Sequence, residues 1–162
     1  MNQMNKQIKL LLDLIHEGYN RKAWHGTNLR GSIRGLTAQQ AAWRPAANRH
    51  NIWEIVVHCA YWKYTVRRRI TGEKRGSFPL EGSNWFKRPV ALTEKSWRVD
   101  IELLEMMHLL LCEAVAELKP SDLSKLSPKK QYTLAATIRG IASHDIYHAG
   151  QIQLLKRFMN HQ

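Results

Sequence analysis

The sequence predicts an all-α fold, a four-helix bundle with one long crossover loop between its second and third helices. Long stretches repeat their apolar residues at the three- and four-residue spacing of amphipathic helices. No segment alternates apolar and polar residues for long enough to build a sheet. The chain has 162 residues, 44% of them apolar, which suits a single domain over residues 1–162 with a substantial core.

The first helix is expected over residues 5–33, where apolar residues mark one face of the earlier half. Glycines weaken the later half, so a bend or an early end stays open. After Gly35, Thr37 and Gln40 fit the capping box of a short helical turn that Pro45 stops. The apolar stripe of the first helix consists of Ile8, Leu11, Leu12, Ile15 and Tyr19.

The second helix is expected over residues 51–70, with Asn51 as its N-cap and Thr71-Gly72 at its end. The next stretch, residues 72–92, has no helical or strand periodicity and is punctuated by glycines and prolines. A connection this long in a small domain is usually functional or mobile, and it predicts the crossover loop. The inner stripe of the second helix consists of Ile52, Ile55, Cys59, Trp62 and Val66.

The third helix is expected over residues 93–118 with Thr93 as its N-cap, and the fourth starts near Thr133 and covers Leu134–Met159. The seam of the third helix alternates spacings of four and three residues, which is typical of a bundle. This seam consists of Trp97, Ile101, Leu104, His108, Leu111, Val115 and Leu118. The buried face of the fourth helix consists of Leu134, Ile138, Ile141, His148, Ile152, Leu155 and Met159.

The chain is strongly basic, with 25 Lys and Arg against 13 Asp and Glu and a formal net charge of +12. Such a charge serves solubility, or it indicates binding to nucleic acid, an acidic membrane surface or an anionic substrate. The positive residues are dispersed apart from small clusters at residues 67–69 and 74–75. This dispersion favours the solubility interpretation.

The sequence indicates neither export nor a membrane span. No stretch approaches the roughly 20 apolar residues of a transmembrane helix, and the N-terminus lacks the apolar region of a secretory signal. Cys59 and Cys112 each lie inside an apolar run and are expected to be free thiols rather than a disulfide. These features predict a cytoplasmic protein.

Two histidines in the fourth helix form the most informative motif. His144 and His148 stand four residues apart, so they share one helix face and can reach one metal ion. A catalytic zinc site needs three protein ligands and an open position. His58, at the edge of the buried stripe of the second helix, is the best third candidate. Glu54, one turn earlier, is expected to accept the second imidazole N–H of His58.

The competing interpretation is structural, because a histidine on an apolar helix face is more often a hydrogen-bonded core residue than a ligand. Asp145 stands where a zinc protease carries its glutamate, so that signature and its general base are absent. Glu54 and Asp145 are candidates for proton transfer only because they flank proposed ligands. His108 is expected to be structural, with lining the site as the alternative. Surface or capping positions are expected for His16, His25, His50 and His161.

The tryptophans in the predicted helices and the one in the crossover loop indicate different roles. The helical spacing of Trp53, Trp62 and Trp97 indicates packing rather than stacking on nucleic acid. Trp85 lies in the glycine-containing loop and is expected either to cover a pocket or to anchor the loop. Cys59 follows His58 directly, so it points about 100° away from it and is expected in the core.

Several motifs occur in an order that spans nearly the whole chain. They are Asn-Ile-Trp-Glu-Ile-Val-Val-His at residues 51–58 with Trp62 behind it, Glu-Gly-Ser-Asn-Trp-Phe at residues 81–86, Gly-Ile-Ala-Ser-His-Asp-Ile-Tyr-His-Ala-Gly-Gln-Ile at residues 140–152, and Trp24-His25-Gly26. In this ordered set the chain resembles the DinB family, also called the DinB/YfiT-like metalloenzymes.

The resemblance implies a four-helix bundle in which His58, His144 and His148 hold a divalent metal ion. It also implies a homodimer and a small-molecule substrate. Characterised members of the family include metal-dependent transferases and isomerases that use low-molecular-weight thiols such as bacillithiol or mycothiol. Arg75 and Lys87, near the loop, are candidates to hold such an anionic thiol cofactor.

The function expected from these observations is that of a metal-dependent enzyme. Three neutral imidazoles leave the full charge of the ion on the site, which activates water for hydrolysis or a thiol for transfer. Zn and Ni are the metals favoured for the site, although imidazole suits several transition metals. Two alternatives stay open, a basic bundle that binds nucleic acid and a metal-binding stress protein without catalytic turnover.

Overall fold

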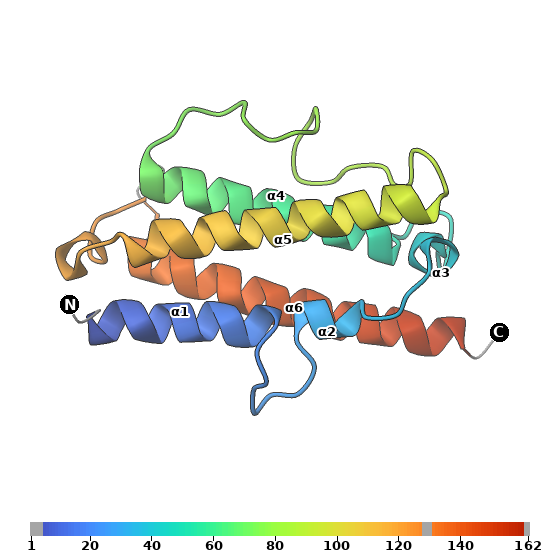
Figure 1. Cartoon of the computed structure of the whole chain (residues 1–162), viewed down its shortest axis with the longest axis horizontal. Helices are drawn as coiled ribbons and strands as arrows, with labels where there is room; N and C mark the ends of the chain where they lie inside the picture. Colours follow the sequence, from blue (N-terminus) through green and yellow to red (C-terminus); the bar gives the residue numbers. More distant parts are fainter. Residues whose placement is uncertain (1–4, 128–130, 161–162) are drawn as a thin grey trace.

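The computed structural model describes residues 5–127 and 131–160 and is built from helices (Figure 1). Four long helices run along the molecule and short helices fill the connections. The long helices are α1 (Lys6–Tyr19), α4 (Ile52–Thr71), α5 (Glu94–Ala116) and α6 (Leu134–Met159). The short ones are α2 (Leu29–Ser32), α3 (Ala38–Ala42) and the 3-10 helix η1 (Pro120–Asp122). The predicted all-α fold is confirmed, and no strand occurs within the described residues.

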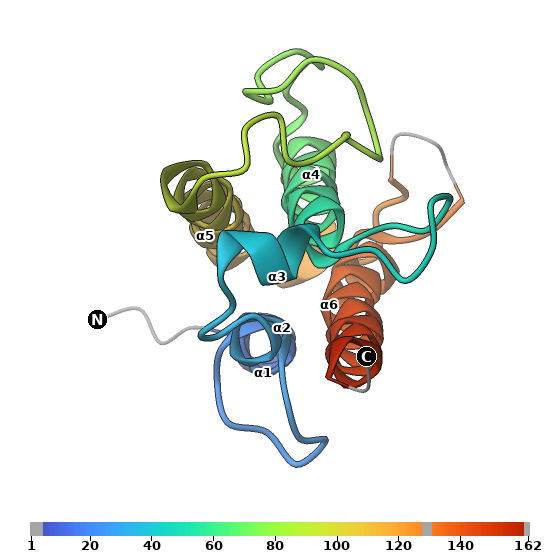
Figure 2. The ribbon, with the colours of Figure 1, turned by 90° about the vertical axis from the view of Figure 1, so that its right-hand side faces the viewer.

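The long helices pack as a four-cornered bundle. Viewed along the bundle, α1 and α2 share one corner, and α5, α4 and α6 follow around it (Figure 2). The edge between α4 and α6 therefore lies opposite the edge between α1 and α5. None of the helices in the described parts of the chain is both long and apolar enough to span a membrane.

The first helix predicted over residues 5–33 ends early, which is one of the alternatives that its glycines left open. Helix α1 ends at Tyr19, and a new helix, α2, begins at Leu29 along the same axis (Figure 1). The connection contains Gly26 at a φ of 98°, which no helix tolerates, and Asn28 caps α2 by accepting a hydrogen bond from the Gly31 amide. The Trp24-His25-Gly26 motif thus lies in a loop rather than in a helix.

The other helices begin and end close to where their caps predicted. Asn51 accepts a 2.7 Å hydrogen bond from the Glu54 amide, and Gly72 ends α4 in the left-handed region at a φ of 76°. Thr93 and Thr133 cap α5 and α6 in the same manner as Asn51. The predicted capping box between Thr37 and Gln40 is confirmed and opens α3.

The crossover loop is fastened to the N-terminal end of α4. The Asn51 side-chain amide donates to the Arg88 carbonyl at 2.8 Å, and the Phe86 side chain is buried against the core. As predicted, Trp53 and Trp97 are core residues, and their rings pack at 5.1 Å between centroids. These contacts fix the segment that carries Asn84 and Trp85 beside α4.

Candidate metal centre

The structure brings together the three histidines predicted as ligands. His58 projects from α4, and His144 and His148 project from α6, the neighbouring helix. The Nε2 atom of His144 lies 3.1 Å from Nε2 of His58 and 3.2 Å from Nε2 of His148. Two imidazole nitrogens that bind one zinc ion at about 2.0–2.1 Å are separated by about 3.0–3.4 Å at common coordination angles. The observed spacing fits a shared ion.

Hydrogen bonds orient two of the three rings. The Nδ1 atom of His58 donates to the backbone carbonyl of Asn84 at 2.9 Å, and Nδ1 of His148 donates to Oε1 of Gln151 at 2.7 Å. Because both partners accept, each Nδ1 carries a proton and each neutral ring presents the Nε2 lone pair toward His144. This is the arrangement of a metal-binding imidazole.

Burial keeps the three imidazoles neutral. It lowers the pKa of His144 to about 3 and that of His148 to about 4, with further lowering from the neighbouring histidines, and it also lowers the pKa of His58. The Nε2 atom of His144 therefore faces two lone pairs and can donate a proton to only one of them. A cation at the common point would be bound by all three nitrogens, so the donor set fits a metal ion.

The histidines lie at the wall of a cavity of about 850 Å³. Its lining is mainly apolar, with Arg49 as a cationic side chain and Tyr147 and Gln151 as polar ones. A cavity of this size and character suits an organic small molecule. The apolar lining residues include Pro45, Ala46, Ile55, Leu154, Leu155 and Phe158.

Trp85 forms part of the cavity wall. Its ring is stacked between the imidazoles of His50 and His58, with centroid distances of 3.6 and 3.9 Å. Trp62, predicted in the core, is only half-buried, and its indole N–H donates to the Asn84 side chain at 2.9 Å. The crossover loop is therefore anchored on α4 through Trp85 and Asn84, and it covers His58 at the same time.

The predicted hydrogen bond between Glu54 and His58 is wrong. Glu54 accepts instead from the Arg44 guanidinium, at 2.5 and 2.9 Å, and from His50 at 2.9 Å. Burial raises the pKa of Glu54, but the hydrogen bonds from Arg44 and His50 outweigh burial and hold that pKa below its usual value. Glu54 is thus a paired carboxylate, and the Asn84 carbonyl takes the place predicted for it.

Asp145 also lies away from the cavity. Its side chain is fully buried on the inner face of α6 and forms an ion pair with Lys63 of α4, which is equally buried. Burial raises the pKa of Asp145 to about 6 despite the opposing effect of Lys63. The residue that follows His144 therefore serves the helix interface. One carboxylate oxygen of Asp145 also lies within 4.8 Å of a ring nitrogen of His144, so its expected role in proton transfer stays a prediction.

Other expectations have mixed outcomes. Arg75 and Lys87, expected near an anionic cofactor, do not line the histidine cavity, and Arg49 does. His50 is exposed as predicted, and its ring bonds to Glu54 four residues later. His25 is exposed as predicted, and His161 lies outside the described residues. The buried positions of Cys59 and His108 are confirmed.

Sequence comparison identifies the family independently of this geometry. The family described as the DinB superfamily matches residues 22–152, a stretch that contains all three histidines of the centre. No curated protein and no solved structure matches the chain.

Proposed function

Because the chain belongs to the DinB superfamily, we propose that it is a metal-dependent enzyme whose three histidines bind one divalent ion beside the cavity. The observation that carries this proposal is the convergence of the Nε2 atoms of His58, His144 and His148 within 3.1–3.2 Å of the central one. Imidazole suits several divalent transition metals, and among them we propose Zn or Ni.

The side chains around the centre have distinct tasks in this proposal. A divalent ion supplies Lewis acidity, which makes water or a thiol a better nucleophile at neutral pH. Asn84 and Gln151 hold His58 and His148 with their Nε2 atoms facing inward. Trp85 shields the His58 ring from solvent by stacking on it, and Arg49 can hold an anionic part of the substrate at the wall.

The metal content of untagged protein tests the centre. We expect the native protein to carry, or to take up, a divalent ion that His148→Ala loses, so that the variant binds about one equivalent less. His25→Ala changes an exposed loop histidine and should behave as the native protein. Equal metal content in the native protein and His148→Ala would contradict the proposal.

The nucleophile is tested by comparing two reactions of the metal-loaded protein. Thiol transfer consumes bacillithiol or mycothiol when an aromatic electrophile is added, whereas hydrolysis releases product from an activated ester without any thiol. The apolar cavity beside the histidines accommodates either substrate. A metal-loaded protein that accelerates neither reaction would favour the alternative of a metal-binding stress protein without turnover.

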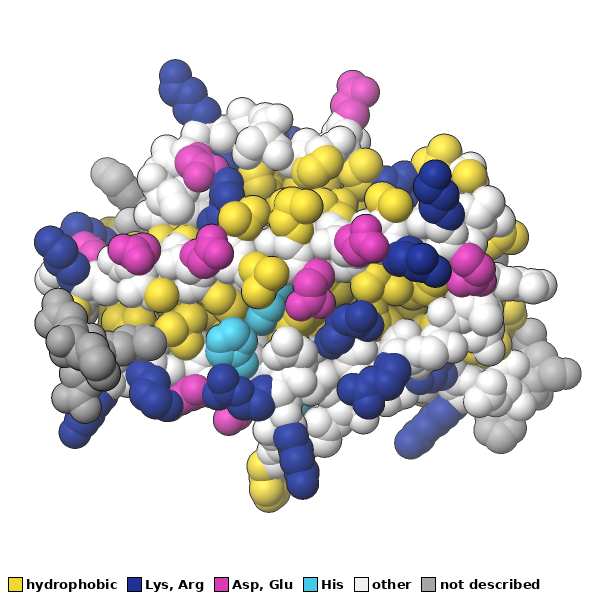
Figure 3. All heavy atoms as spheres, in the orientation of Figure 1, with side chains coloured by type: hydrophobic (Ala, Val, Ile, Leu, Met, Phe, Trp, Pro, Cys, Tyr) yellow, Lys and Arg dark blue, Asp and Glu magenta, His cyan; other side chains and the backbone are white. Residues whose placement is uncertain are grey.

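The net positive charge of the chain is better explained by solubility than by nucleic-acid binding. On the face shown in Figure 3, Lys and Arg side chains are dispersed and interspersed with acidic ones. Nucleic-acid binding instead favours a continuous basic stripe, so the distribution on this face is more typical of solubility than of nucleic-acid binding. The homodimer and the cytoplasmic location are parts of the proposal that rest on the resemblance and on composition. Size-exclusion chromatography with light scattering tests the dimer.

A further inference from the structure

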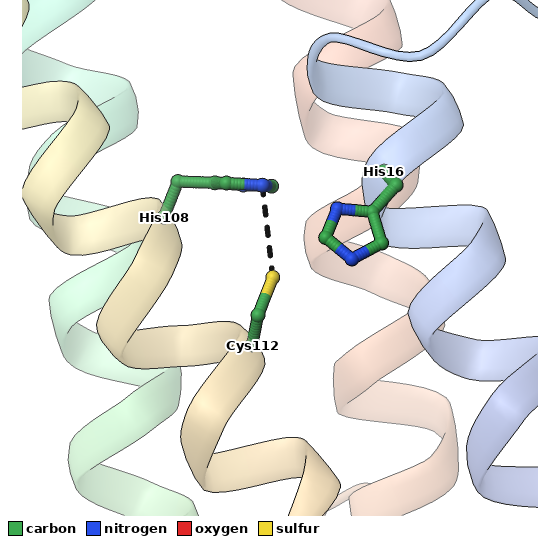
Figure 4. Close-up of side chains that lie close together, drawn as sticks. All are labelled: His16, His108 and Cys112. Atoms are coloured by element: carbon green, nitrogen blue, oxygen red, sulfur yellow. Dashed lines mark hydrogen bonds between the residues drawn. The ribbon is translucent and has the colours of Figure 1, made fainter.

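A second cluster of metal-ligating side chains lies between α1 and α5, away from the cavity. His108 and Cys112 stand four residues apart on α5, and His16 of α1 faces them (Figure 4). The Nε2 atom of His108 lies 3.6 Å from the sulfur of Cys112, and the rings of His16 and His108 are 5.4 Å apart. One ligand atom from each residue falls within 4.8 Å of the others.

His108 lacks the hydrogen bonds that a buried histidine normally makes. Its side chain is 1% exposed, and its Nδ1 atom has no partner among the residues that the structure describes. One face of the His108 ring is stacked on the Tyr19 ring, with 3.8 Å between centroids. The other ring nitrogen, Nε2, makes a weak contact with the Cys112 sulfur. Such an undersatisfied buried group points to a ligand that the protein atoms do not supply.

The cluster is open to solvent on one side. His16 and Cys112 are both half-buried, and histidine side chains reach the surface in the groove between α1 and α5 (Figure 3). A neutral imidazole carries one lone pair, and a ring nitrogen of His108 lies within 4.8 Å of ligand atoms of His16 and Cys112. An ion can therefore enter from the groove and meet His108 at the bottom.

We propose that His16, His108 and Cys112 form a second metal site that takes a thiophilic ion such as Zn²⁺ or Cu⁺. Two imidazoles and one thiolate form a ligand set suited to these ions. On binding, the S–H bond of Cys112 breaks, its proton passes to solvent and a sulfur–metal bond forms. The ion would tie α1 to α5, on the edge of the bundle opposite the three-histidine centre (Figure 2).

Cadmium provides a probe that reports sulfur ligation directly. Titration of reduced, metal-free protein with Cd²⁺ should produce an ultraviolet thiolate-to-metal charge-transfer band, which a site made only of imidazoles cannot give. We expect the band in the native protein and in His144→Ala, which lacks the three-histidine centre. Cys112→Ala should lose the band, and Cys59→Ala, the matched change of the other cysteine, should keep it.

Absence of the band in the native protein, its persistence in Cys112→Ala or its loss in Cys59→Ala would each overturn the proposal. Helical circular dichroism of each variant verifies folding. His16→Gln changes a half-buried residue and should lower Cd²⁺ affinity by about tenfold or more. Unchanged affinity would remove His16 from the site. The metal content of His148→Ala tests the first centre separately, so the two proposals fail independently.

Discussion

At the scale of single residues, the candidate centre depends on partners that the histidines find outside their own motif. His144 and His148 are brought together by helix periodicity alone, since residues four apart share a face. Their use as ligands also requires that each ring present the correct nitrogen. For His148 that orientation comes from Gln151, and for His58 it comes from the Asn84 carbonyl. The side chain of Gln151 can therefore be tested apart from the ligands.

Replacing Gln151 by Ala should weaken metal binding without unfolding the protein. The variant frees the Nδ1 atom of His148, and loss of such an outer hydrogen bond typically costs about 10–100-fold in metal affinity. Gln153→Ala, two residues further along α6 and outside the cavity lining, is the matched control. Competition with a chelator of known affinity measures the difference. Equal affinities of the two variants would show that Gln151 does not position His148.

Breaking the buried ion pair between Lys63 and Asp145 at the α4–α6 interface should destabilise the protein far more than breaking an exposed pair. Both side chains are fully buried, so Lys63→Met leaves a carboxyl group without its partner, which costs about 3–5 kcal/mol. Lys9→Met removes an exposed pair with Asp13, which keeps Arg21 as a partner, and should cost far less. Urea denaturation of both variants measures these free energies. A similar small cost at both positions would show that the buried pair contributes no more than an exposed one.

At the scale of helices, the sequence predicts what is local and misses what is not. Asn51 and Thr93 predict helix starts because an N-cap bonds to residues two or three positions later in the chain. The bounds of α4, α5 and α6 lie close to those predicted. The break after Tyr19 was only one of the alternatives left open, because the glycines there allow a loop without requiring one. The pairing of Lys63 with Asp145 was also missed, because it depends on which helices become neighbours.

The difference between local sequence signals and contacts between distant elements also explains which site residues could be predicted. The pair on α6 was predictable from its spacing, and His58 from its place on an inward stripe supported by the ordered motifs. The Asn84 carbonyl was not, because a backbone acceptor in a loop has no side-chain signature. His50 carried a local signal that was overlooked, since it stands four residues before Glu54 and pairs with it.

Two glycines should respond in opposite ways to the same substitution. Gly18 of α1 lies against α6, where an added Cβ would come within 2.8 Å of the Ala142 carbonyl oxygen. Gly18→Ala should therefore destabilise the protein by about 1–3 kcal/mol, as overpacking does. Gly140 of α6 has open space around its Cα, so Gly140→Ala should stabilise the protein by up to about 1 kcal/mol through helix propensity.

Thermal denaturation compares these variants with the native protein. The opposite signs provide the control, because both positions lie inside helices and gain the same methyl group. Stabilisation by both substitutions would mean that α1 and α6 can separate slightly without cost at Gly18.

At the scale of the whole molecule, each cluster of ligands joins two helices that are distant in sequence. The three-histidine centre joins α4 to α6, and the second cluster joins α1 to α5 on the opposite edge (Figure 2). In each case the hydrophobic core brings the helices together, and the polar atoms then face one another at their interface. An ion that binds the folded protein and not the unfolded chain must add to the stability of the bundle.

Zinc should therefore raise the melting temperature of the whole bundle in a manner that depends on His58. At a free Zn²⁺ concentration 100 times the dissociation constant, binding to one site stabilises the folded state by about 2.7 kcal/mol. The measurement is made on Cys112→Ala, so that only the three-histidine centre contributes. Adding His58→Ala should remove most of the shift, because the two histidines of α6 bind zinc more weakly and cannot tie that helix to α4. An undiminished shift after this second substitution would place the stabilising zinc elsewhere on the molecule.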